Sequence, residues 1–361
     1  MAALNPSAAW VATAVAAEVD ALKIGVLLPP EEPQSRSVRE GVLLAKEKAN
    51  KRNTKPLDII IRGRVGQWGA DGVEAARMVT EDGVDGLIAP PDGAASHLTL
   101  QVSGRTAVPV VTLCADSSVG RTGVPWLLRI VPRTTDEAKA LFTGIPPLAT
   151  SQTNHWLALV PEGHAGREIS RDLSQAALGS AIHFEKIVEF NATPSNGELV
   201  CSQVLTNGAN VVLLWLDPSP AAKVAKSLRT AGYHGVLAGP GRLQCADFVN
   251  AAGEALDGFI VPAIVRLAEN SARLRSFQTD YHQRWGHLPD TMAAMSYDAA
   301  MLLSHLLSQP EFQMPPHRLT PGFSWPGVTG DLAFDAAGNR AVQLELLQTH
   351  EGKFIRIAKA N

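Results

Sequence analysis

From residue 22 onward, the chain alternates between short apolar runs of strand length and longer segments with the amphipathic pattern of helices. The first run, Leu22–Pro30, ends in two prolines, and a helical pattern over Ser35–Lys48 follows it. This order predicts parallel sheets covered by helices, because parallel neighbouring strands need a crossover connection. Open sheets of this kind bind ligands beyond the carboxyl ends of their strands, so the loops there are the candidate site.

The repeats fall into two series, and 361 residues are enough to build two hydrophobic cores. The first series has expected strands at Leu22–Pro30, Leu57–Arg62, Gly86–Ala89 and Val108–Leu113, and Leu127–Pro132 is expected to leave that sheet. The second series has expected strands at His155–Val160, Ile182–Glu189, Val211–Leu216, Val236–Ala238 and Gly258–Val261. Two long helices and two further strand patterns end the chain, so the fold class is α/β.

Composition excludes several classes of function. The formal net charge is −3, and basic residues do not cluster with aromatic ones, so no nucleic-acid partner is expected. No apolar run is long enough to cross a bilayer. The three cysteines lack metal-ligand spacing, so no metal and no cofactor are expected. Cys201 and Cys245 can pair in an oxidising compartment, but two ordinary buried thiols are the favoured interpretation.

The first 20 residues have features of a leader. Ala8–Ala17 has the length of a signal-peptide apolar region, and Ala14 and Ala16 match a small-x-small cleavage pattern. No Lys or Arg precedes Lys23, so the basic start of a signal peptide is absent. Residues 1–20 are therefore expected to be a signal remnant of a periplasmic protein, with an alanine-rich leader on a cytoplasmic protein as the alternative.

Several local sequences, together with the order of the elements, resemble one family. The segments are Pro109–Ser118 (PVVTLCADSS), Leu128–Glu137 (LRIVPRTTDE), Val211–Gly232 (VVLLWLDPSPAAKVAKSLRTAG), Ser296–Ala300 (SYDAA) and Gly327–Arg340 (GVTGDLAFDAAGNR). The chain resembles the type I periplasmic solute-binding proteins of ABC transporters, in the branched-chain amino-acid-binding branch. The likeness extends from Leu22 almost to the end of the chain.

The resemblance implies two Rossmann-like lobes with parallel sheets, joined by a three-strand hinge. The first lobe would comprise 21–132 plus 265–325, and the second 133–264 plus 326–361. The chain would cross between the lobes near Ile130–Thr134, Val261–Val265 and Phe323–Thr329. Hinge closure would trap a small molecule, which the protein would deliver to the permease of an ABC importer, with no enzymatic step.

The resemblance also points to loops that would contact the ligand. The candidate residues are Trp68, Pro91, Asp92, Gly93, Cys114, Ala115, Asp116 and Ser117 from the first lobe, and Glu162, Asp217 and Arg242 from the second. Hydroxyl-bearing residues are expected at several of these places, and Asp or Pro stands there instead. If the carboxylates face the cleft, they favour a cationic ligand.

Two other interpretations of these residues are consistent with the sequence. Asp92 and Asp116 are also suited to cap the helices that follow them, and Asp217 to cap the turn before Pro220. The prolines around Pro91, together with Trp68, favour an apolar ligand instead. Alternatively, Trp68 packs within its own lobe and does not contact the ligand. The sequence does not choose among these interpretations, so the ligand remains open among amino acids, cations and apolar compounds.

Two rival functions complete the sequence-based picture. One is a cytoplasmic small-molecule sensor of the same fold, as in amide-sensing regulators. The other is an α/β enzyme whose site has no recognisable motif. No G-x-S-x-G sequence occurs, the ten histidines are scattered and the glycines of Gly239-Pro240-Gly241 do not complete a dinucleotide fingerprint, so the enzyme is disfavoured.

Overall fold

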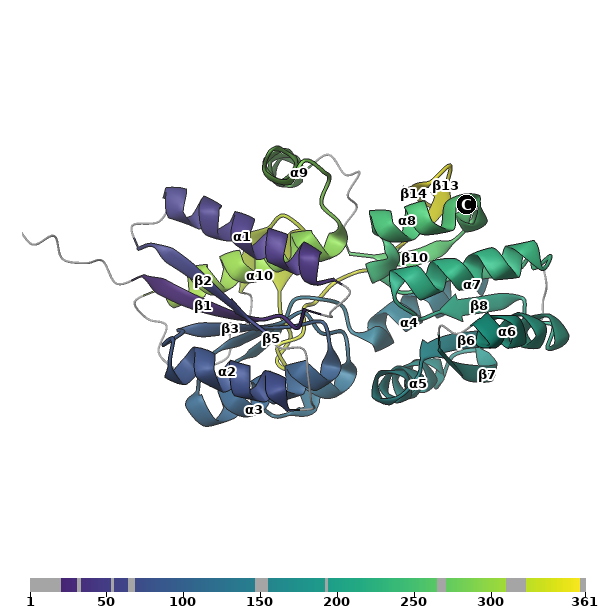
Figure 1. Ribbon diagram of the computed structural model, residues 1–361, viewed down its shortest axis with the longest axis horizontal. Coiled ribbons are helices and arrows are strands. Elements are labelled where there is room, and N and C mark those ends of the chain that lie inside the picture. Colours follow the sequence, from purple (N-terminus) through teal and green to yellow (C-terminus); the bar gives the residue numbers. More distant parts are fainter. Residues whose placement is uncertain are drawn as a thin grey trace, which may run out of the picture.

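The computed structural model describes residues 21–30, 34–52, 55–63, 69–146, 155–191, 194–264, 271–309 and 323–357. These residues form two lobes, each a sheet with helices on both faces (Figure 1). The expected leader, 1–20, lies outside the described residues, and so does Trp68.

The first lobe contains a five-stranded parallel sheet in the order β2-β1-β3-β4-β5. Its strands are β1 (Leu22–Leu27), β2 (Leu57–Arg62), β3 (Gly86–Ala89), β4 (Val110–Thr112) and β5 (Leu127–Arg129). The expectation that 127–132 leaves the sheet is therefore wrong for its first part. Val111 pairs with Leu128, which makes β5 the fifth strand, and the chain leaves the sheet only after Arg129.

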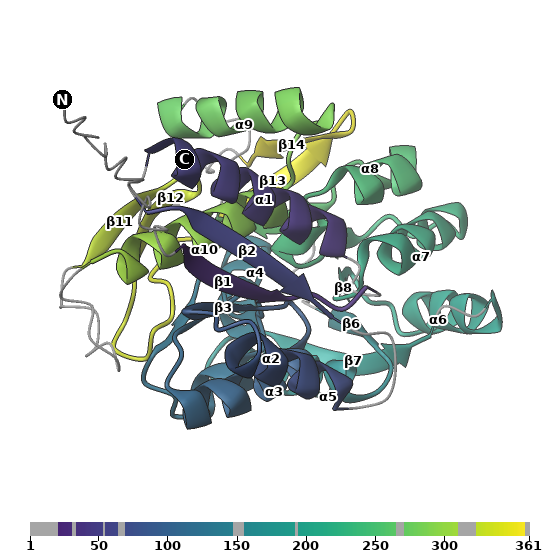
Figure 2. The same cartoon turned by 60° about the vertical axis from the view of Figure 1, so that its left-hand side comes forward.

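Five helices and one 3-10 turn cover this sheet. They are α1 (Ser35–Arg52), α2 (Ala70–Thr80), α3 (Gly93–Thr106), η1 (Ser117–Arg121), α9 (Ala272–Trp285) and α10 (Thr291–Leu307). Helix α10 is apolar on nearly every side and almost wholly buried, because it lies against α1 and the sheet in one core (Figure 2). Gly69 is the N-cap of α2 and has a φ of 94°, a backbone conformation that favours glycine, and Asp71 lies in the first turn of the helix.

The second lobe contains a seven-stranded sheet in the order β14-β13-β10-β9-β8-β6-β7. Strands β6 (His155–Pro161), β7 (His183–Phe190), β8 (Val211–Leu214), β9 (Val236–Ala238) and β10 (Ile260–Ala263) are parallel, and β13 (Glu345–His350) and β14 (Lys353–Arg356) add an antiparallel edge. The helices are α4 (Thr134–Gly144), α5 (His164–Ala177), α6 (Pro194–Thr206), α7 (Pro218–Thr230) and α8 (Ala246–Ala252), with 3-10 turns η3 (Gly241–Leu243) and η4 (Gly253–Leu256).

The chain passes between the lobes after β5, after β10 and before β13. The third passage lies later than the sequence suggests, because the hairpin of β11 (Ser324–Gly327) and β12 (Gly330–Ala333) packs with the first lobe (Figure 2). Leu332 is buried in the core that α1 and α10 share, and Arg340 donates its backbone N–H to Arg129 of β5. The crossing therefore falls between Ala341 and Glu345, and the hairpin belongs to the first lobe.

Two further observations concern the whole molecule. Within the described ranges, no helix has both the length and the apolar character needed to span a bilayer. All three cysteines are free thiols, with Cys114 and Cys201 buried and Cys245 partly buried, so the structure does not contain the Cys201–Cys245 bridge.

Candidate ligand-binding site

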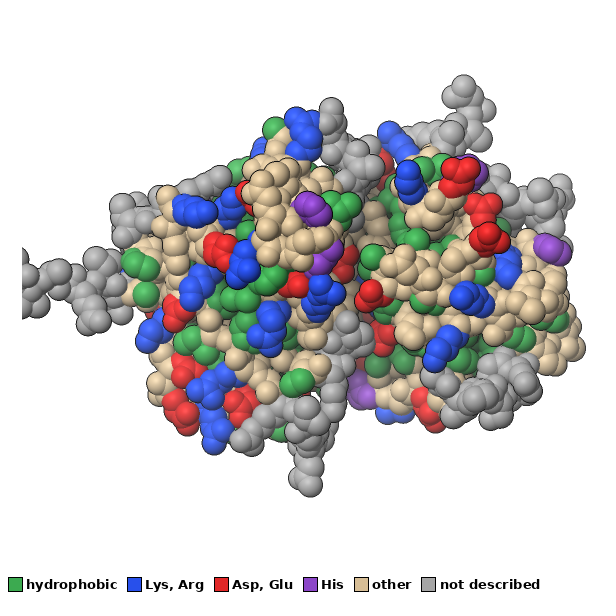
Figure 3. All heavy atoms as spheres, turned by 45° about the horizontal axis from the view of Figure 1, so that its top comes forward, with side chains coloured by type: hydrophobic (Ala, Val, Ile, Leu, Met, Phe, Trp, Pro, Cys, Tyr) green, Lys and Arg blue, Asp and Glu red, His purple; other side chains and the backbone are tan. Residues whose placement is uncertain are grey.

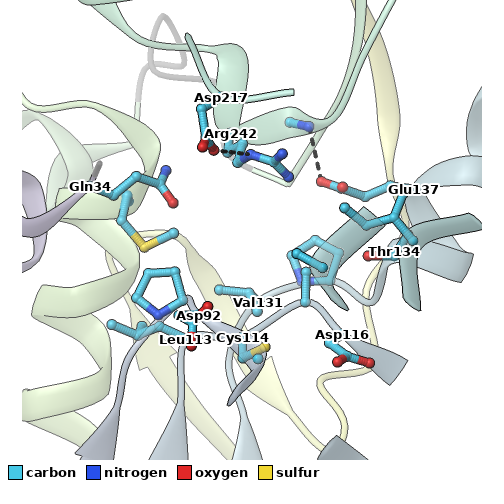
Figure 4. Close-up of a pocket in the computed structure, with 18 of the residues that line it drawn as sticks. Gln34, Asp92, Leu113, Cys114, Asp116, Val131, Thr134, Glu137, Asp217 and Arg242 are labelled. Carbon is cyan, nitrogen blue, oxygen red and sulfur yellow. Dashed lines mark hydrogen bonds and ion pairs between the residues drawn. The ribbon is translucent and has the colours of Figure 1, made fainter. Parts of the chain in front are cut away.

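A cavity of about 290 Å³ lies between the two lobes (Figure 4). This volume is at the lower end of the range for small-molecule sites, about 300–1,000 Å³. Figure 3 shows the groove between the lobes, with acidic side chains along its edge. The site is therefore suited to a small ligand held by both lobes.

The amino ends of several helices meet at this cavity. Residues of the first turns of α3, α4, α5 and α10 line it, as does Asp217, the N-cap of α7. This follows from the topology, because each of these helices except α10 begins after a strand of the parallel arrangement or a hinge crossing. A helix amino end carries a partial positive charge and unsatisfied N–H groups, so their convergence favours a negatively charged ligand group.

Two aspartates from the first lobe both cap helices and line the cavity. The Oδ1 of Asp92 accepts a hydrogen bond from Ala95 N at 2.7 Å, and the Oδ1 of Asp116 accepts one from Ser118 N at 2.7 Å. The capping and the cleft-facing interpretations of these residues are therefore both met by the structure. Their charges are partly offset by the helix ends that they cap.

The loop after β4 is held from behind by a buried arginine. The Nη1 of Arg129 donates to the backbone carbonyls of Cys114 and Asp116, and its Nε donates to Asn339 at 3.1 Å. Burial raises the pKa of the Cys114 thiol to about 12. Cys114 therefore lines the cavity as a neutral, weakly polar group, and the loop around it is fixed in position.

The second lobe contributes a guanidinium group, that of Arg242 in η3, which points into the cavity (Figure 4). Its Nη2 donates to the carbonyl of Leu216 at 3.1 Å, and its Nε lies 3.7 Å from Oδ1 of Asp217 without a hydrogen bond. The Asp217 side chain is half exposed, so this ion pair is loose. Arg242 is therefore free to direct its remaining donors at a ligand.

A buried glutamate lies beside this arginine. Glu137, in the first turn of α4, accepts a hydrogen bond at Oε1 from Gly241 N at 3.0 Å (Figure 4). Burial raises the pKa of Glu137 to about 7, although the nearby Arg242 opposes the shift. The carboxyl group is therefore divided between its neutral and ionised forms at neutral pH.

Apolar side chains form most of the remaining wall. They come from both lobes and from the crossings, namely Leu113, Val131, Pro132, Ile169, Pro262, Met292 and Met295. The Thr134 residue at the start of α4 adds a hydroxyl that faces the cavity (Figure 4). The arrangement suits a ligand with an apolar body and one charged end.

The lobes also touch each other beside the cavity. Ser117 of the first lobe donates its backbone N–H to Oδ2 of Asp172 on α5 at 3.1 Å. Thr291 of α10 donates its hydroxyl to Oε1 of Gln244 at 3.2 Å. Burial raises the pKa of Asp172, and the hydrogen bonds from Ser117 oppose that shift. Both contacts join the lobes across the cleft.

Most of the residues expected from the sequence lie at the cavity. Those that line it are Pro91, Asp92, Gly93, Cys114, Ala115, Asp116, Asp217 and Arg242. Ser117 does not line it and instead contacts Asp172, and Glu162 is exposed and accepts a hydrogen bond from Asn191 at 3.2 Å. Trp68 is outside the described residues.

Sequence reasoning missed several cavity residues in α4, α5 and α10 and in the segments beside α1 and η3. They include Gln34, Thr134, Glu137, His164, Asp172, Gln244, Met292 and Met295. One available signal was Asp290, whose side chain accepts from Ala293 N and so marks the start of α10 beside the two methionines. Met292 and Met295 are three residues apart and therefore share one face of that helix.

A serine–histidine contact occurs that the scattered histidines of the sequence did not suggest. The Nε2 of His97 lies 2.8 Å from the Oγ of Ser118. Neither residue is among those that line the cavity. Among the described residues, no group of three or more His, Cys, Asp or Glu side chains is placed to hold a metal ion.

Two lobes, three crossings and a cavity between them define a two-lobed binding protein of the type I periplasmic architecture. The chain belongs to the periplasmic binding protein family, whose sequence profile matches residues 21–343. It is thus a solute-binding protein by family. No curated protein matches it in sequence.

Solved structures share the fold at low sequence identity. A solute-binding protein of an ABC transporter from R. palustris, in complex with benzoate, has a TM-score of 0.82 at 16% identity, covering 94% of this chain and 96% of that one. The branched-chain amino acid binding protein LivJ from Streptococcus pneumoniae, in complex with isoleucine, has a TM-score of 0.81 at 16% identity, covering 93% and 98%. The leucine binding protein LivK from Thermotoga maritima has a TM-score of 0.79 at 18% identity, covering 93% and 98%.

Proposed function

We propose that this protein captures a small carboxylic acid with an apolar body in the periplasm. It then delivers the acid to the membrane-embedded permease of an ABC importer. The observation that carries the ligand class is the Arg242 guanidinium, which points into a mainly apolar cavity where helix amino ends converge. A carboxylate there accepts hydrogen bonds from the guanidinium and from backbone N–H groups. The similar protein from R. palustris was solved with benzoate, which has this chemistry.

The cationic ligand suggested by the acidic residues of the cleft is the competing proposal. Asp92 and Asp116 accept helix N–H groups, Asp172 accepts from Ser117, and Glu168 pairs with Arg171 at 2.6 Å. These carboxylates therefore already have partners within the protein. The Nη2 of Arg242 donates to the carbonyl of Leu216, whereas Nη1 makes no hydrogen bond with the described residues, which favours the acid over the amine.

Binding calorimetry with three ligands of similar shape separates the two proposals. We expect benzoate to bind, and we expect neutral benzamide and cationic benzylamine to bind at least tenfold more weakly. Arg242→Gln should weaken benzoate binding about 30-fold, because a charged hydrogen bond contributes about 2 kcal/mol. Arg356→Gln, which alters an exposed guanidinium on β14 of the same lobe, away from the cavity, is the matched control and should leave the affinity unchanged.

The result that would overturn the proposal is equally specific. If benzylamine binds more tightly than benzoate, and if Arg242→Gln has no effect on either, then the cavity selects cations. Asp217→Asn adds a second check, because removal of the loose partner of Arg242 should strengthen benzoate binding. Weakened benzoate binding in that variant would mean that the pair positions Arg242 rather than competes for it.

A further inference from the structure

Glu137 connects two parts of the site that lie about a hundred residues apart in the sequence. Its side chain is only 6% exposed, and Oε1 accepts the backbone N–H of Gly241, the first residue of the turn that carries Arg242. No other residue of α4 is hydrogen-bonded to that turn among the described contacts. The position of the Arg242 turn thus depends on a carboxyl group that also faces the ligand space.

The packing around Gly241 leaves little room for adjustment. A Cβ atom at this position would lie 2.6 Å from the carbonyl oxygen of Pro262 and 2.8 Å from Oε1 of Glu137. Such contacts are too short for real atoms, so the residue must be glycine if the carboxyl group is to reach the backbone.

We propose that Glu137 is a specificity-determining residue of the ligand site: it positions the turn that carries Arg242, and it takes up a proton when an anionic ligand binds. The proposal rests on the proposed function, since it needs an anionic ligand. It adds that the site binds acids more tightly as the pH falls. It also assigns that dependence to one carboxyl group.

The charged groups around Glu137 come from four places. On its own helix the neighbour is Asp136, which pairs with Arg133 at 2.8 Å. The side chains that line the same cavity from α5, η3 and the loop before α7 are His164, Glu168, Asp172, Arg242 and Asp217. Strand β10 contributes only Pro262 and Ala263 there, and on β13 Leu346 faces Gly144 at the far end of α4.

The sign of the effect follows from these charges. A ligand carboxylate placed at Arg242 adds a negative charge near Glu137 and diminishes the positive charge that the arginine presents to it. Both changes disfavour the ionised form of Glu137. Its pKa in the complex therefore rises above the value of about 7 that it has in the ligand-free protein. For each unit by which ligand binding raises this pKa, the dissociation constant of the acid is about tenfold larger at high pH than at low pH. The dissociation constant begins to increase near pH 7.

Calorimetry on the wild-type protein tests the proton uptake directly. Benzoate remains an anion throughout the pH range 6–9, so its own ionisation does not contribute. We expect the dissociation constant to be constant below about pH 6.5 and to weaken about tenfold by pH 9. At pH 7.5, titrations in two buffers of different ionisation enthalpy should give different heats, which correspond to a fraction of a proton taken up.

Three variants assign the proton to its group. Glu137→Gln keeps an oxygen that accepts from Gly241 but cannot titrate, so benzoate affinity should become independent of pH and remain at the low-pH value. His164→Gln tests the histidine of the cavity, the residue type that usually takes up protons near neutral pH, and should keep the dependence. Glu254→Gln changes an exposed carboxylate of the same lobe and should also keep it.

The outcomes distinguish this inference from the proposed function. If benzoate binds with no proton uptake and a constant affinity over pH 6–9, the role of Glu137 is wrong while the ligand class stands. The same holds if the dependence disappears in His164→Gln and persists in Glu137→Gln. If no acid binds at any pH, the proposed function itself fails. If Glu137→Gln does not fold, two measurements still test the inference. The two-buffer titration of the wild type shows whether a proton is taken up, and His164→Gln shows whether the histidine takes it up.

Discussion

The carboxylate of Asp298 in α10 accepts two hydrogen bonds from Thr329, one from its backbone N–H at 2.9 Å and one from its hydroxyl at 2.5 Å. It also accepts the N–H of Val328 at 2.8 Å. Arg340 in turn donates to the hydroxyl and the carbonyl of Thr329. These bonds fix the β11–β12 hairpin to the first lobe, immediately before the chain crosses to the second.

Replacement of Asp298 should therefore destabilise the protein strongly. Asp298→Ala leaves three donors without an acceptor in a fully buried place, so we expect a loss of about 3 kcal/mol in the free energy of unfolding, measured by urea denaturation. Asp331→Ala on the same hairpin is the control, because its side chain is 70% exposed and its contact with Arg273 should contribute less than about 1 kcal/mol. Equal losses in the two variants would contradict the assignment.

The stability of the ligand-free protein should depend on pH through Glu137. Because burial raises its pKa from 4.5 to about 7, the folded state retains a proton that the unfolded state has released between these values. The contribution of Glu137 to the free energy of unfolding is thus fully present below pH 4.5. It is lost as the pH rises to 7, by about 3 kcal/mol in total. The stability of Glu137→Gln relative to wild type should rise by that amount between pH 4.5 and pH 8.

Urea denaturation of both proteins at several pH values measures this difference. Asp298, whose pKa burial raises to about 6, has the same sign of effect in both proteins and cancels in the comparison. A difference between the two proteins that stays constant with pH would show that Glu137 is ionised equally in the folded and unfolded states.

The contact between Ser117 and Asp172 should influence the relation of the two lobes. Asp172→Ala removes the acceptor for a backbone N–H across the cleft, so we expect a larger radius of gyration by small-angle X-ray scattering and a roughly tenfold weaker benzoate affinity. Asp172→Asn keeps an oxygen that can accept the same N–H and should resemble the wild type. An alanine variant with unchanged scattering and affinity would mean that the contact does not hold the lobes together.

The hydroxyl of Thr134 should contribute to ligand affinity without a role in folding. It faces the cavity from the start of α4. Thr134→Val has nearly the same shape, so we expect an unchanged melting temperature in the absence of ligand and about fivefold weaker benzoate binding by calorimetry, equivalent to about 1 kcal/mol. Thr143→Val at the exposed end of the same helix is the control, since its hydroxyl bonds only to Lys139.

Much of the site could be predicted because strand ends are visible in a sequence. Pro91, Asp92, Cys114 and Asp116 directly follow apolar runs, and loops after parallel strands gather at one edge. Glu162 also follows a strand but bonds to Asn191 outside the cavity. Strand position therefore predicts which loops reach the edge, but not which side chain of a loop turns inward.

The apolar alternation of the chain by itself determined the two-sheet α/β fold, because the periods of two and 3.6 residues record which faces are buried. Only the tertiary structure decided that β5 joins the first sheet, that the β11–β12 hairpin stays with the first lobe, and that Glu137 meets Gly241. These outcomes depend on hydrogen bonds and packing between residues far apart in the chain. Local sequence patterns carry no information about such contacts, so the partners of the charged groups in the cavity became known only with the folded structure.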